Sequence, residues 1–82
     1  MDEYVIKKQE LEDWVQSSRP RAKMIYYEGF LINDRDHSMP LKKLGKLALS
    51  MYEKGLVILY QKKLSHGDTS KDPVFEYIAQ RI

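Results

Sequence analysis

Residues 51–82, MYEKGLVILYQKKLSHGDTSKDPVFEYIAQRI, decide the fold that we expect for this chain. Two apolar, strand-like segments, residues 56–64 and 74–82, are separated by the nine-residue loop SHGDTSKDP, which is rich in turn-forming residues. Consecutive strands joined by turn chemistry alone favour antiparallel pairing. The phrase EKGLV at residues 53–57 indicates a helix that ends at a glycine and leads into the first strand. The stretch therefore predicts a helix followed by a C-terminal antiparallel hairpin.

The helix before the hairpin has the most regular pattern in the chain. It is expected to start at Ser38 or Asp36 as the capping residue, to carry Pro40 in its first turn and to stop at Gly55. At helical spacing its residues divide into an apolar arc and an opposite, mostly basic arc. The apolar arc comprises Leu41, Leu44, Leu47, Ala48, Met51 and Tyr52. The opposite arc comprises Lys42, Lys43, Lys46, Ser50, Glu53 and Lys54.

Two more elements are expected upstream. Residues 4–17 predict a helix that Pro20 ends, and residues 23–33 predict a strand that bends near Gly29. The helix should turn Tyr4, Leu11, Trp14 and Val15 to one side. Simple alternation should place Met24, Tyr26, Glu28, Phe30 and Ile32 on one face of the strand, and Ile25, Tyr27, Gly29 and Leu31 on the other. The predicted fold is α+β, in the order helix, strand, helix, strand, strand, with residues 1–82 as a single domain.

Composition narrows the class of protein. The chain has 82 residues, of which 43% are hydrophobic, and no cysteine, so it is expected to fold around a thin core without disulfides or thiolate metal sites. Its longest apolar run, residues 56–60, is too short to span a bilayer, and the N-terminus lacks a signal-peptide pattern. We therefore expect a soluble, cytoplasmic protein that does not act at a membrane.

The ionisable residues give no catalytic or metal-binding pattern. His37 and His66 stand alone in separate turns, and the four glycines are too scattered to form a phosphate-binding loop. The serines, histidines and carboxylates form no recognisable nucleophile and base pair. The sequence thus favours a non-enzymatic protein without a metal or other cofactor.

Basic residues interleaved with aromatics form the one pattern that points to a function. The net charge of +2 is unevenly distributed: residues 1–18 carry two lysines against five carboxylates, and residues 19–82 carry twelve basic residues against seven acidic ones. The candidate nucleic-acid contacts are Lys42, Lys43, Lys46, Ser50 and Lys54 on the helix, Lys62, Lys63 and Lys71 in the hairpin, and Arg19 and Arg21 before the first strand. Ordinary solubilising surface charge is the alternative interpretation. Since the loop also contains Asp68 and Asp72, the helix is the stronger candidate and the loop an accessory contact.

The helix, the Glu53-Lys54-Gly55-Leu56-Val57 phrase and the hairpin resemble the second half of winged helix-turn-helix DNA-binding domains. The resemblance implies a winged-helix-like fold in which Lys42, Lys43, Lys46, Ser50 and Lys54 face the DNA groove and residues 66–71 form the tip of the wing. The family has two helices between its first strand and the wing. Here either residues 33–43 contain a short first helix, or the helix-turn-helix unit is reduced. The general character of the chain is also similar to that of small winged proteins of phages and prophages.

These patterns predict a small protein that binds nucleic acid, with double-stranded DNA as the expected target, or that regulates transcription. The alternative is a protein-interaction module, such as an inhibitor or adaptor that docks on a larger complex, because six tyrosines and an acidic first helix suit an interface. Either function is compatible with a homodimer that uses the C-terminal strand or the helix bearing Trp14.

Overall fold

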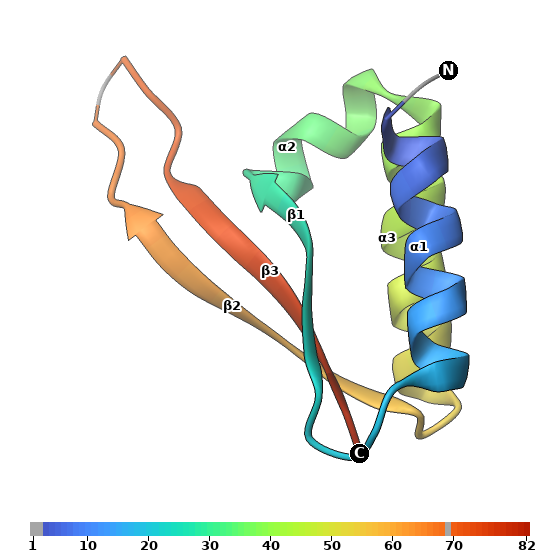
Figure 1. Ribbon diagram of the computed structural model, residues 1–82. Helices are drawn as coiled ribbons and strands as arrows, with labels where there is room; N and C mark the ends of the chain where they lie inside the picture. The colour runs from blue at the N-terminus through green and yellow to red at the C-terminus, as the bar shows by residue number, and fades with distance from the viewer. Residues whose placement is uncertain (1–2, 69) are drawn as a thin grey trace.

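The fold is a three-stranded antiparallel sheet with two long helices on one side (Figure 1). The computed structural model describes residues 3–68 and 70–82, apart from the side chain of Ile32. Its elements are α1 (Glu3–Ser17), β1 (Lys23–Gly29), α2 (Leu31–Asp34), the 3-10 helix η1 (Arg35–His37), α3 (Met39–Glu53), β2 (Val57–Ser65) and β3 (Val74–Arg81). The strand order is β1-β3-β2, and β3 pairs antiparallel with both neighbours. The predicted α+β class, the order of the main elements and the C-terminal hairpin are confirmed.

The core lies between the two long helices and the inner face of the sheet. Its buried side chains are Leu11 and Val15 of α1, Leu41, Leu44, Ala48 and Met51 of α3, and Tyr26, Val57, Tyr77 and Ala79 of the strands. The spacing of the α3 residues follows one face of a helix, as the sequence predicted. Tyr52 is an exception, because it lies at the edge of the apolar arc and is 52% exposed. The apolar arc predicted from the sequence is therefore not buried at Tyr52.

Both ends of α3 form as their local chemistry predicts. Ser38, rather than Asp36, caps the helix, because its Oγ accepts a hydrogen bond from the Leu41 N–H at 3.3 Å. At the other end Gly55 adopts a φ of +75°, which suits a glycine after a helix terminus. The short helical segments α2 and η1 precede the cap, so the region between β1 and α3 contains helical turns before α3 itself begins.

Strand β1 is shorter than predicted and is irregular. A bulge shifts the register between Ile25, which pairs with Ile78, and Tyr27, which pairs with Tyr77. The extra residue, Tyr26, lets two consecutive tyrosines turn toward the helices. The predicted alternation is therefore wrong at two points: Tyr26 and Tyr27 share a face, and Glu28 lies on the opposite face.

The chain leaves the sheet at Gly29, where a bend was predicted. Gly29 has a φ of +149°, and a Cβ placed there would lie 2.8 Å from Asp34 Oδ2. Leu31 then starts α2, so residues 30–33 are not part of the strand as the sequence suggested. The predicted position of the Ile32 side chain lies outside the described residues.

Candidate nucleic-acid interface

The outer face of α3 carries the largest group of candidate contacts. Lys42, Lys43 and Lys46 are exposed there, on the side of the helix opposite the buried leucines. Ser50 continues the same stripe but is half-buried, and Lys54 is exposed at the C-terminal cap. We refer to Lys42, Lys43, Lys46, Ser50 and Lys54 as the α3 basic face.

The lysines of this face carry unpaired charge within the described chain. The ion pairs among residues 3–68 and 70–82 are Lys7 with Glu10, at 3.0 Å, and Lys8 with Glu12, at 3.5 Å, and both lie on α1. Glu53 is the one acidic residue of α3, at its last position. Four lysines on one exposed helical face therefore remain available for an external anion.

The hairpin lysines do not form a common surface. Lys63 is opposite Phe75, and its Nζ lies 5.7 Å from the centroid of that ring, on the inner side of the sheet. Lys62 is opposite Glu76, on the outer side. Alternation along a strand separates adjacent residues in this way. A nucleic-acid strand lying on one face of the sheet would thus contact either Lys62 or Lys63, but not both.

The loop at the hairpin tip is held by its own side chains. Asp68 Oδ1 accepts hydrogen bonds from the Ser70 N–H at 2.7 Å and from Ser70 Oγ at 2.8 Å, and these bonds lower the pKa of the Asp68 carboxyl. The tip therefore keeps a negative charge near Lys71. Thr69, inside the predicted wing tip, lies outside the described residues. The Asn33 side-chain amide donates to Asp72 Oδ2 at 3.2 Å, which links the loop to α2.

Arg19 and Arg21 lie at the other end of the sheet. They belong to the connection between α1 and β1, where the Arg21 N–H donates to the Arg81 carbonyl oxygen at 2.8 Å, and the hairpin loop is at the opposite end of the strands (Figure 1). The structure thus separates these arginines from Lys71. Of the predicted contacts, it gathers the α3 basic face and distributes the others around the molecule.

A polar and aromatic cluster joins α2 to β1 and β3. Tyr27 donates its hydroxyl to Asp34 Oδ2, and the same oxygen accepts from the Phe30 N–H at 3.0 Å. The Leu31 N–H donates to the Tyr77 hydroxyl at 3.0 Å. Burial, and then the hydrogen bond to Asp34, raise the pKa of Tyr27. These bonds fix α2 to the sheet, and no spacing in the sequence indicated them because the bulge at Tyr26 decides which tyrosine reaches Asp34.

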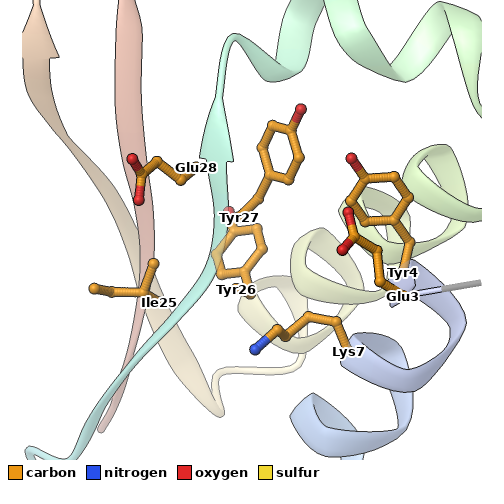
Figure 2. Close-up of a pocket in the computed structure, with 7 residues that line it drawn as sticks. All are labelled: Glu3, Tyr4, Lys7, Ile25, Tyr26, Tyr27 and Glu28. Atoms are coloured by element: carbon orange, nitrogen blue, oxygen red, sulfur yellow. The ribbon is translucent and has the colours of Figure 1, made fainter.

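A shallow pocket of about 280 Å³ lies between the start of α1 and β1, with Tyr26 and Tyr27 directed toward the helices and Ile25 and Glu28 directed away from them (Figure 2). Its lining residues are Glu3, Tyr4, Lys7, Ile25, Tyr26, Tyr27 and Glu28. Among the described residues, no three His, Asp or Glu side chains are grouped to hold a metal ion. The pocket therefore presents three tyrosines beside two glutamates and one lysine.

Comparison with known proteins finds no matching family model, no similar curated protein and no similar solved structure. None of the helices in the described part of the chain has the length and apolar character needed to cross a membrane. The candidate interface therefore has to be judged on its own geometry and charge.

Proposed function

We propose that this chain binds double-stranded DNA through the α3 basic face, with the hairpin as an accessory contact. The observation that carries the proposal is the exposure of Lys42, Lys43 and Lys46 on one side of α3 with no ion pair in the described chain. Lysines in this state can replace the counterions condensed on a duplex, and the released counterions favour binding. An exposed α-helix also has the width that the major groove admits.

The order of elements supports the same proposal. Between β1 and the hairpin the chain has the short segments α2 and η1 and then α3, which is compatible with the two helices that winged helix-turn-helix domains have there. In that arrangement the second helix enters the groove and the hairpin contacts the flanking backbone. The proposal assigns these roles to α3 and to the β2–β3 hairpin.

Duplex binding measured by fluorescence anisotropy at two salt concentrations tests the proposal. With three phosphate contacts, the affinity should fall by roughly 40-fold between about 50 and 200 mM salt. The reason is that the base-10 logarithm of the binding constant falls by about 0.9 per phosphate contact for each tenfold rise in salt concentration. Lys42→Gln/Lys46→Gln should remove two of these contacts and lower the salt slope by about 2.

Lys7→Gln/Lys8→Gln is the matched control, since it removes the same charge from α1, where both lysines are already in ion pairs. It should leave both the affinity and the salt slope close to those of the unaltered protein. The proposal is wrong if no duplex binds at low salt, or if the α1 pair and the α3 pair weaken binding equally.

A protein partner at the same helix is the second candidate function. Met39, Leu49 and Tyr52 are large apolar residues of α3 that are at least half exposed, and side chains of this kind are common at protein interfaces. Sequence spacing could have singled out Leu49, because it falls outside the apolar arc. Binding of a purified partner that persists at about 300 mM salt and is lost on Leu49→Ser, without any duplex binding, would favour this alternative, since apolar contacts are little affected by screening.

A further inference from the structure

The outer face of the sheet, which is turned away from α1 and α3, is built from three rows of paired residues. Strand pairing places one residue each from β1, β3 and β2 side by side in every row. The rows are Lys23, Gln80 and Ile58; Ile25, Ile78 and Tyr60; and Glu28, Glu76 and Lys62. We call these the lysine row, the apolar row and the glutamate row.

The apolar row gives this face a hydrophobic centre. Ile78 is only 9% exposed, yet it is not part of the core between the helices and the sheet, because its neighbours Ile25 and Tyr60 cover it on the outer face. Ile25 itself is 46% exposed and points away from the helices (Figure 2). Among the described residues, neither long helix packs on this side of the sheet (Figure 1).

The charges on this face are balanced, but within the glutamate row Lys62 is the neighbour of Glu76 alone, and Glu28 has only Glu76 beside it. Lys23 and Lys62 offset Glu28 and Glu76, so the face has no net charge, in contrast to the basic chain as a whole. Glu28 and Glu76 lie directly opposite each other across β1 and β3, and like charges in this position destabilise a sheet. Neither carboxylate forms an ion pair within the described chain.

We propose that a second copy of the chain packs against this face, with a two-fold axis that runs along the apolar row. Rotation about this axis places the apolar row of one copy on that of the other and exchanges the outer rows. Lys23 of each copy then lies over Glu28 of the other, and Gln80 over Glu76. Each copy thus supplies a cation to Glu28 and an amide donor to Glu76 of the other, as a self-complementary two-fold interface requires. Nucleic acid does not suit this face, because the opposed glutamates repel phosphate.

The size of the face sets the strength of the association. Strands of seven to nine residues, at about 3.3 Å per residue and about 4.8 Å between strands, give a face of roughly 350 Å² per copy. Two such faces bury roughly 700 Å² in total, which is below the roughly 1,000 Å² that stable specific interfaces exceed and corresponds to a weak, transient contact. The dimer is therefore expected to form at high micromolar concentration and to dissociate on dilution.

A dimer of this kind has both pairs of long helices on its outside. The two α3 basic faces then point in opposite directions, so one dimer would join two duplexes instead of gripping one. This consequence rests on the proposed function, whereas the sheet-to-sheet contact does not.

Sedimentation equilibrium from about 10 µM to 1 mM, without nucleic acid, tests the contact. The average mass should rise from 9.7 kDa toward twice that value. Ile25→Lys should weaken association at least tenfold. Val5→Lys is the matched control, because Val5 is similarly exposed, at 47%, but belongs to α1 on the opposite side of the sheet, and it should leave association unchanged. Circular dichroism is used to check that both variants fold.

Charge reversal tests the two-fold arrangement. Glu28→Lys and Lys23→Glu should each weaken the dimer several-fold, and Lys23→Glu/Glu28→Lys should recover it, because each copy again presents opposite charges to the other. A constant monomer mass up to 1 mM, an equal effect of Ile25→Lys and Val5→Lys, or no recovery in the double variant would overturn the proposal. Duplex affinity at low micromolar protein concentration is measured separately, so failure of the dimer leaves DNA binding by α3 unaffected.

Discussion

Replacing Tyr27 with phenylalanine tests how α2 is held against the sheet. The Tyr27 hydroxyl donates to Asp34 Oδ2, and its ring contacts those of Tyr4 and Tyr77, with centroids 5.8 and 5.9 Å away. Phenylalanine keeps the ring contacts and opens no cavity. The substitution thus removes the hydrogen bond to the Asp34 carboxylate and the weaker interaction of the hydroxyl with Tyr4, and leaves Asp34 with the Phe30 N–H.

A hydrogen bond to a charged group contributes about 1.5–3 kcal/mol when it is buried. Both side chains are only half-buried, so solvent can partly replace the lost donor, and we expect the free energy of unfolding to fall by about 1–2 kcal/mol. With a urea m-value of about 1 kcal/mol/M for a small chain, the midpoint should fall by roughly 1–2 M.

Urea unfolding followed by circular dichroism measures this shift. Tyr52→Phe is the control. Because Tyr52 lies on the surface of α3, removing its hydroxyl should change the urea midpoint of unfolding very little. If Tyr27→Phe unfolds at the same urea concentration as Tyr52→Phe, the bond to Asp34 does not stabilise the fold, and α2 must be held by its other contacts.

Two further predictions concern stability. Gly29→Ala should lower the free energy of unfolding, measured by urea titration, by about 3 kcal/mol, because the backbone conformation of Gly29 suits only glycine and the new Cβ would approach Asp34 Oδ2. Gly55→Ala should lower it by only about 1 kcal/mol, since Gly55 has a φ of +75° but open space around it. Equal losses of stability in the two variants would contradict this reasoning. Burial, and then the neighbouring Tyr77, raise the pKa of Tyr26 from 10.0 to about 12, so the folded state holds this proton more tightly than the unfolded state. The contribution of Tyr26 to the free energy of unfolding should therefore be fully present below about pH 10 and fall by about 2 kcal/mol as the pH rises to 12, so Tyr26→Phe should reduce the loss of stability over this interval.

The parts of the fold that sequence predicts are those set by local chemistry. The α3 helix has its cap at Ser38, its terminating Gly55 and its buried leucines at helical spacing, and all three signals are contained in the segment itself. The bulge at Tyr26 has no such signal. It depends on pairing with β3, which is distant in sequence, and Gly29 and Asp34 then direct the chain into α2. Alternation alone therefore misplaced the strand faces.

The candidate contacts of the site also include some that local sequence predicts and some that it does not. The exposure of Lys42 and Lys46 follows from helical spacing and could be predicted. The opposite directions of Lys62 and Lys63 also follow from strand alternation, once the strand is located. By contrast, the distance of Arg19 from the hairpin loop depends on how the connection before β1 pairs with the end of β3. That contact joins the two halves of the chain, and no local pattern encodes it.

The α3 basic face and the outer face of the sheet lie on opposite sides of the molecule, because the fold has one layer of helices and one layer of strands. Two helices of fifteen residues each cover one face of the sheet and leave the other face to solvent or to another molecule. In a two-layer domain that solvent face is normally polar. Lys23, Gln80 and the glutamate row follow this rule, whereas Ile25, Ile58 and Tyr60 do not. Because the α3 basic face is separated from these residues by the whole core, substitutions on one surface should change one binding reaction without changing the other.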